Sequence, residues 1–199
     1  DYAPLAEHVY RIRREPYVII NSPQDRAGLT SPQPVDFQVV WEKAPYYVQV
    51  ELDGSIFYSG ESLPSPGLLT IDPSRLEQGH HVLTVRVGDG EKSAVESVGF
   101  SVPRSIQING LDGYRYVYIS GLLPISVTTT NIAVAEAVIV IDGKTEEPLY
   151  QGAALPEMTI DTLQLSEGEH TIEIRIRDIY GREFSHQTEF IVKNYQIMD

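Results

Sequence analysis

The chain has 199 residues, of which 28 are acidic and 15 basic, and its formal net charge is −13. This charge argues against nucleic acid and against an anionic membrane surface as partners, because binding to phosphate groups needs a cationic face. Cysteine is absent, which excludes disulfide bonds, thiolate nucleophiles and cysteine-based metal sites. No apolar run approaches the roughly 18 residues that a membrane helix needs, so we expect no membrane insertion.

Residues 1–15 come first, and their apolar side chains fit two different periods. Leu5, Val9 and Ile12 have helical spacing, whereas residues 9–13 also alternate as a strand does. We interpret residues 1–15 as an N-terminal linker or short extension that packs loosely on the domain that follows.

Residues 16–103 are expected to form a first domain of short strands separated by turn residues. The strongest turn signal is Asp53-Gly54, which lies between two β-rich runs, because both residues tolerate positive φ. The expected strands, in chain order, cover residues 17–20, 35–41, 48–52, 56–58, 68–71, 83–88 and 95–102.

Residues 104–199 repeat the same pattern and are expected to form a second domain. The clearest copy is LEQGHHVLTVRVGD, which starts at Leu76 and returns as LSEGEHTIEIRIRD at Leu165. The Asp53-Gly54 turn returns as Asp142-Gly143, with a short insertion after it. Insertions that fall in turns while strands are preserved are typical of a repeated fold.

The strand inside the repeat shows which kind of sheet to expect. Leu83, Val85 and Val87 alternate with polar residues, and Ile172, Ile174 and Ile176 alternate with charged ones. One face of this strand is therefore buried and the other meets water, as in an antiparallel sheet. With about seven strands per copy and no helical segment between them, the sequence predicts an all-β protein. It consists of two tandem immunoglobulin-like, Greek-key β-sandwich domains.

These motifs resemble those of a known group of modules. The carriers are a strand ending in apolar-Asp-Gly, a later Gly-x-His followed by alternating apolar residues and Asp, and a final Phe-x-Val. This pattern, over about residues 17–192, is similar to bacterial immunoglobulin-like and fibronectin type III-like domains. The resemblance implies a sandwich fold and a place in a multi-domain secreted or cell-surface protein. It implies no particular activity, because sandwiches carry unrelated functions.

The repeated histidines His81 and His170 are the first candidates for chemistry. Each could be a metal ligand or a base, but we find no second ligand beside it at a metal-binding spacing. Each lies on the inward side of its strand, so we expect its ring N–H to bond a backbone group at the strand entrance. The repeated aspartates are expected to form turns and caps, with Ca²⁺ a minor possibility. No motif of a nucleophile, metal or phosphate site is present, so we expect no enzyme, catalytic residue or cofactor.

Tyrosines give the clearest hint of binding. Tyr114, Tyr116 and Tyr118 share one face of an extended segment, and Tyr46 and Tyr47 precede a strand in the first domain. Tyrosine offers a flat apolar ring with a hydroxyl, which suits sugar rings and protein surfaces. The alternative is that these rings cover the joint between the domains or fill a loop.

We expect a non-catalytic pair of modules that acts as a spacer, stabilising or docking unit of an exported bacterial protein, for example one attached to an extracellular hydrolase. Its partners would be other domains of the parent protein, and its location secreted or on the cell surface. The alternative is an adhesion module that binds a polysaccharide or a cell-surface protein through the exposed tyrosines.

Overall fold

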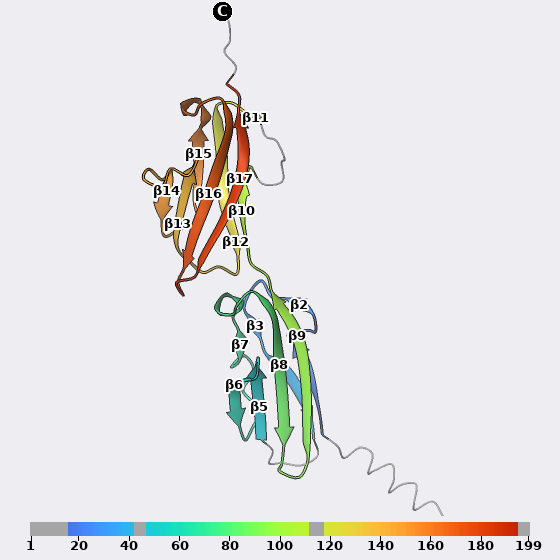
Figure 1. Ribbon diagram of the computed structural model, residues 1–199. Coiled ribbons are helices and arrows are strands. Elements are labelled where there is room, and N and C mark those ends of the chain that lie inside the picture. The colour runs from blue at the N-terminus through green and yellow to red at the C-terminus, as the bar shows by residue number, and fades with distance from the viewer. Residues whose placement is uncertain (1–15, 42–46, 112–117, 195–199) are drawn as a thin grey trace, which may run out of the picture. The chain divides into compact units, whose positions relative to one another are not determined.

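The structure is a computed structural model of the chain, and it describes residues 16–41, 47–111 and 118–194. The chain divides into two compact units, with the boundary between Pro103 and Arg104. Within the described residues the helical elements are two short 3₁₀ turns, η1 (Pro73–Arg75) and η2 (Thr162–Gln164), and all other regular elements are strands. The predicted all-β fold is therefore confirmed (Figure 1).

Unit 1 contains a five-stranded sheet in the order β2-β9-β8-β5-β6 and two ribbons, β1–β4 and β3–β7. All pairs are antiparallel except β2–β9, which is parallel. The strands are β1 (Tyr17–Ser22), β2 (Ala27–Gly28), β3 (Gln33–Pro34), β4 (Asp36–Val40), β5 (Tyr47–Leu52), β6 (Ser55–Gly60), β7 (Thr70–Ile71), β8 (Gly79–Gly88) and β9 (Ser93–Val102).

Unit 2 repeats this plan with a five-stranded sheet, β11-β17-β16-β13-β14, and a three-stranded sheet, β10-β12-β15. The β11–β17 pair is parallel, as β2–β9 is in unit 1. The strands are β10 (Ser105–Asn109), β11 (Tyr118–Ile119), β12 (Leu122–Thr130), β13 (Val134–Ile141), β14 (Tyr150–Gly152), β15 (Glu157–Asp161), β16 (Gly168–Asp178) and β17 (Glu183–Val192).

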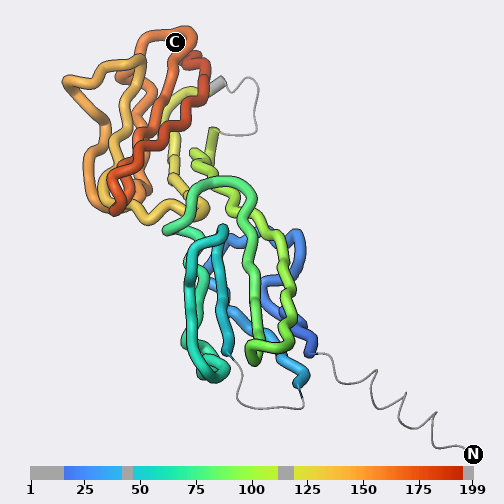
Figure 2. The backbone as a smooth tube through the Cα atoms, turned by 60° about the horizontal axis from the view of Figure 1, so that its bottom comes forward, coloured from blue at the N-terminus to red at the C-terminus, as the bar shows by residue number. Residues whose placement is uncertain are grey.

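The core of each unit lies between its sheets, because strands of both layers turn alternate apolar side chains inward. In Figure 2 the blue trace of β1 and β4 forms a layer separate from the green trace of β8 and β9. In unit 2 the inward row Ile172, Ile174 and Ile176 is almost fully buried, and it shares one cluster with Ile108 and Ile125 of the facing sheet. The corresponding row of unit 1 is Leu83, Val85 and Val87. The alternation in the sequence therefore identified the buried face of both strands.

In each unit, a tyrosine on the edge strand of the larger sheet packs over the glycine two residues later, Tyr58 over Gly60 and Tyr150 over Gly152. We call this arrangement the tyrosine clip. We expected the strand after Asp53-Gly54 to stop before Ser59, but β6 continues through Gly60. The Tyr58 ring lies across Gly60, where an added Cβ would come within 2.5 Å of the phenol oxygen. Its hydroxyl donates to the Ser62 carbonyl at 3.0 Å, and Tyr150 repeats the arrangement over Gly152. Glycine here leaves room for the tyrosine ring, and it lies in a strand, not in a turn.

The buried face of β16 can be tested by removing one side chain from its centre. Ile174→Ala is expected to lower the free energy of unfolding by about 2–5 kcal/mol, because the fully buried side chain leaves a cavity. Ser185→Ala, on the exposed side of neighbouring β17, is the control and should change it by no more than about 0.5 kcal/mol. Urea denaturation of both variants measures the difference. Equal effects at the two positions would contradict the assigned faces.

Candidate functional site

Of the five candidate tyrosines, Tyr47 is the one whose backbone and side chain are both among the described residues. Tyr114, Tyr116 and Tyr46 lie outside the described residues, and only the backbone of Tyr118 is described, in β11. Tyr47 begins β5 and is 44% exposed. Its ring lies across Gly88 of β8, where a Cβ would come within 2.7 Å of it. The ring therefore lies against the β8 backbone. No contact among the described residues links Tyr47 to another candidate tyrosine.

The repeated histidines are buried and bonded in each unit. In unit 2 the imidazole of His170, at the start of β16, is bonded at both ring nitrogens. Nδ1 lies 2.8 Å from Oδ2 of Asp142, and Nε2 lies 2.7 Å from the carbonyl oxygen of Ser166. The other carboxylate oxygen of Asp142 accepts the backbone N–H of Thr171 at 3.0 Å. We call this set of contacts the Asp–His bridge.

Unit 1 contains the same bridge in the same geometry. Nδ1 of His81 lies 2.7 Å from Oδ2 of Asp53, and Nε2 lies 2.8 Å from the carbonyl oxygen of Glu77. The backbone N–H of Val82 donates to Oδ1 of Asp53 at 2.9 Å. The ring of His81 stacks on Phe100, as that of His170 packs beside Phe190. The repeated motifs apolar-Asp-Gly and Gly-x-His are therefore two halves of one interaction.

The hairpin turn holds the aspartate of each bridge in position. Asp53 and Asp142 have φ values of 52° and 51°, in the left-handed region that aspartate tolerates better than most residues. Each aspartate also donates its own backbone N–H to the strand beside it, at 2.9 Å to the Val82 carbonyl and 2.8 Å to the Thr171 carbonyl. The residue type is thus required both for the turn and for the contact with histidine.

The charge state of the bridge follows from its partners. A carboxylate and a carbonyl oxygen both accept hydrogen bonds, so an imidazole between them satisfies both when both nitrogens carry protons. Burial lowers the pKa of His170, but its bonds to the Ser166 carbonyl and to Asp142, with the Asp142 charge, outweigh burial and raise the pKa overall. The pKa of His81 is raised in the same way, against the effect of burial, by Asp53 and the Glu77 carbonyl.

The carboxylate of Asp142 shows the reciprocal effect. Burial raises its pKa, but the N–H of Thr171 and the imidazole of His170 outweigh this and lower the pKa overall. The bridge in unit 2 is therefore best described as an imidazolium–carboxylate pair that occupies every polar atom of both side chains. It leaves no free nitrogen for a general base or a metal. The expected backbone bond of each histidine is present, whereas its carboxylate partner was missed.

The other repeated aspartates bond the backbone of their own turns. Asp72 and Asp161 accept from the backbone N–H groups of Ser74 and Leu163 at the starts of η1 and η2. Asp178 is 2% exposed and accepts from the Tyr180 and Arg182 backbones and from the Arg182 guanidinium. Over residues 16–41, 47–111 and 118–194, no three histidine or carboxylate side chains gather to hold a metal ion. No helical element in this part of the chain is long or apolar enough to cross a membrane.

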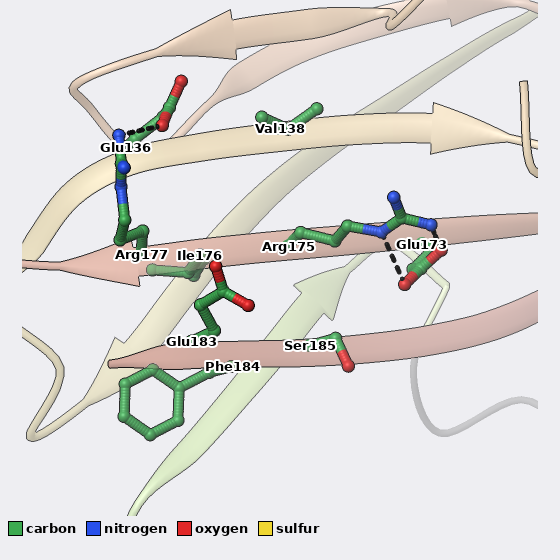
Figure 3. A pocket seen from close by; sticks show the side chains of 9 residues that line it. All are labelled: Glu136, Val138, Glu173, Arg175, Ile176, Arg177, Glu183, Phe184 and Ser185. Carbon is green, nitrogen blue, oxygen red and sulfur yellow. Dashed lines mark hydrogen bonds and ion pairs between the residues drawn. The ribbon is translucent and has the colours of Figure 1, made fainter. Parts of the chain in front are cut away.

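A hollow of about 470 Å³ lies on the outer face of the larger sheet of unit 2. Figure 3 shows its side chains on β13, β16 and β17, with two ion pairs among them. Arg177 contacts Glu136 at 2.6 Å, and Arg175 contacts Glu173 at 2.7 Å. The amide of Gln151 and the charge of Arg177 lower the pKa of Glu136.

The charges around this hollow largely satisfy one another. Arg175 bonds both oxygens of Glu173, at 2.9 and 2.7 Å, and so both side chains are already paired. Exposed pairs of this kind contribute little to stability. The hollow is therefore a charged surface of the sheet, and its geometry does not indicate catalysis.

No protein-family model and no curated protein matches this chain. Among solved structures, the fibronectin(III)-like modules of Clostridium thermocellum CbhA align over 92% of this chain and 97% of theirs, with 14% identity and a TM-score of 0.36. Three N-terminal domains of the bacteriophage RB49 capsid protein Hoc align over 89% of this chain and 59% of theirs, with 13% identity and a TM-score of 0.44.

Sidekick-1 immunoglobulin domains 1–5 align over 89% of this chain and 39% of theirs, with 12% identity and a TM-score of 0.44. This chain therefore spans less than two thirds of the phage and Sidekick-1 structures. At these identities and scores, no residue role or function is transferred from any of the three structures.

The two Asp–His bridges predict a specific dependence of stability on pH. Because the pKa of each histidine is higher in the folded chain than its ordinary value of about 6.5, the bridges contribute fully below that pH. Their contribution is lost as the pH rises through the folded pKa, so the free energy of unfolding should fall on the alkaline side of about pH 6.5. Urea denaturation at a series of pH values measures this.

The double variant His81→Gln/His170→Gln is the control, since it retains His80 and His186 but has no bridge. At pH 6 each substitution is expected to cost about 1 kcal/mol, because the buried imidazole and its hydrogen bonds to the aspartate and the backbone carbonyl are lost. The alkaline fall should be much reduced in this variant. An unchanged pH profile would show that the bridges are not protonated.

Proposed function

We propose that this chain is a non-catalytic pair of modules that serves as a spacer, stabilising or docking unit of an exported bacterial multi-domain protein. The observation that carries the proposal is the Asp–His bridge in both units. The only histidines that the repeat retains are bonded at both ring nitrogens within the fold, and this gives them a structural role. Acidity and the absence of cysteine are compatible with a secreted or cell-surface location, where charge keeps proteins apart.

A parallel pair that joins the second strand of each unit to its last strand supports a spacer. In unit 2, β11 runs parallel to β17, and Lys193 N–H donates to the Ile119 carbonyl at 2.9 Å. In unit 1, the backbone N–H groups of Arg26 and Leu29 donate to Gly99 and Ser101 of β9, at 2.6 and 2.8 Å. Tension applied through the chain would load several such bonds together, because the paired strands are parallel. Each unit would therefore unfold at a higher force than a domain of the same size that lacks such a parallel pair.

A matched pair of substitutions tests this resistance. Lys193→Pro removes the backbone donor to Ile119, whereas Lys193→Ala keeps it and changes only an exposed side chain. In single-molecule extension, the proline variant is expected to unfold unit 2 at a clearly lower force than the alanine variant. Equal forces for the two variants would argue against load-bearing by the β11–β17 pair.

A second candidate function is binding of carbohydrate or protein through exposed tyrosines. It is favoured by Tyr47, whose ring lies beside Gly88 while 44% of the residue stays exposed. A partly exposed tyrosine ring offers an apolar surface and a hydroxyl, which suit a sugar ring or a protein contact.

Assays on the whole chain separate the two candidates from each other and from an enzyme. We expect no turnover of glycoside, ester or peptide substrates above the blank, and no binding on a glycan array. Glycan binding that disappears in Tyr47→Ala, or in the combined alanine variant of Tyr114, Tyr116 and Tyr118, would favour the binding module. Turnover that is lost in His81→Gln/His170→Gln while the fold persists would refute the non-catalytic proposal.

A further inference from the structure

His80 precedes the bridge histidine of unit 1 and lies on the exposed face of β8. Its Nδ1 lies 3.0 Å from the carbonyl oxygen of His81 and 3.2 Å from that of Phe100. Carbonyl oxygens only accept hydrogen bonds, so Nδ1 carries the proton and donates it. In the neutral ring the lone pair is therefore on Nε2, which has no hydrogen-bond partner within the described part of the chain.

Gly99 of β9 makes room for this ring beside a carboxylate. A Cβ at Gly99 would lie 3.0 Å from Nε2 of His80 and 3.7 Å from Oδ1 of Asp25. The β9 backbone holds the turn of Asp25 in place, because Gly99 donates its N–H to Oδ1 at 3.1 Å and accepts the N–H of Arg26 at 2.6 Å. His80 and Asp25 thus lie near one point above β9, and both line a hollow of about 450 Å³.

Unit 2 has different residues at these places of the same sheet. By strand register, Glu169 stands in the place of His80 and Glu189 in the place of Gly99. The Asp–His bridge beside them is present in both units. The sandwich therefore folds without a histidine at this position, and the core does not account for the pair of His80 and Asp25.

We propose that His80 and Asp25 bind a divalent transition-metal ion such as Zn²⁺. Imidazole nitrogen and carboxylate oxygen are both zinc ligands, with bonds of about 2.0–2.2 Å. A metal-binding histidine usually donates its other ring N–H to a carboxylate or a backbone carbonyl, which fixes the tautomer and the orientation of the ring. His80 meets this condition through the carbonyls of His81 and Phe100. Water completes the coordination shell, and the proposal goes beyond the spacer or docking role and does not depend on it.

The charges beside the pair set how tightly an ion is held. The Asp25 side chain is 62% exposed, so it is free to turn an oxygen toward an ion bound at Nε2 of His80. Nε of Arg26 lies 3.5 Å from Oδ2 of Asp25, and this arginine side chain is 93% exposed. Its guanidinium competes with a cation for the carboxylate, but an exposed pair of this kind is weak and opens readily. Arg26 therefore weakens the site and does not block it.

Calorimetric titration of the whole chain with Zn²⁺ tests the proposal. His80→Gln is expected to lower the affinity for Zn²⁺ by about tenfold or more, because the imidazole ligand is lost. Asp25→Asn keeps an acceptor for the Gly99 N–H, so the turn should persist, and it should also weaken binding. His186→Gln in unit 2 removes a histidine outside the bridges and is the control, which should bind as the unaltered chain does. Equal affinity in all four proteins, or no heat of binding in the unaltered chain, would overturn the proposal.

Two further variants keep both ligands and change only their surroundings. Gly99→Ala places a Cβ 2.6 Å from Cε1 of His80, which displaces the ring and should weaken Zn²⁺ binding. Arg26→Ala removes the competing charge and should strengthen binding about threefold. If His80 had only a structural role, neither change would alter the affinity.

Nuclear magnetic resonance identifies the atom that binds. Zn²⁺ is expected to shift the ¹⁵N resonance of Nε2 of His80 much more than that of Nδ1, which stays bonded to carbonyls. Ca²⁺ prefers oxygen ligands and should shift neither nitrogen. Equal shifts with Ca²⁺ and Zn²⁺ would overturn the proposal, because they would reflect the general attraction of cations to a chain with a net charge of −13.

Discussion

One Asp–His bridge in each unit joins three segments of the chain. In unit 2, Asp142 sits in the hairpin turn, accepts the N–H of Thr171 in β16 and contacts His170 at the entrance to the same strand. His170 in turn reaches the carbonyl of Ser166, before the strand begins. The turn, the strand entrance and the connection that precedes it are thus fixed together. Unit 1 depends on Asp53 and His81 in the same way.

The two units agree where side chains point inward and differ where they point outward. Both keep the Asp–His bridge, the tyrosine clip and the inward apolar rows. On the outer face of the larger sheet, Tyr47 opposite Gly88 takes the place of Glu136 opposite Arg177. Because core packing restricts the inward residues and leaves the outward ones free, differences in what the units do are expected to lie on these outer faces.

The strong alternation of the long strands made them predictable. β8 and β16 were identified with their buried faces, because one apolar residue in every two is an unambiguous signal. The two-residue strands β2, β3 and β11 were missed, since they are too short to show a period and exist only through pairing with distant strands. Gly60 was read as a turn, whereas it lies in β6 beneath the ring of Tyr58.

The sequence by itself determined the strand content, the repeat and the direction in which each long strand faces, because these depend on the order of neighbouring residues. It also marked aspartate, glycine and histidine as repeated, but it could not show that Asp53 meets His81 or that Asp142 meets His170. Each pair is separated by 28 residues, and only the closed sheet brings the turn beside the strand entrance. The tertiary structure therefore decided the role of the histidines, since a ring between two acceptors holds a proton that an isolated imidazole releases more easily.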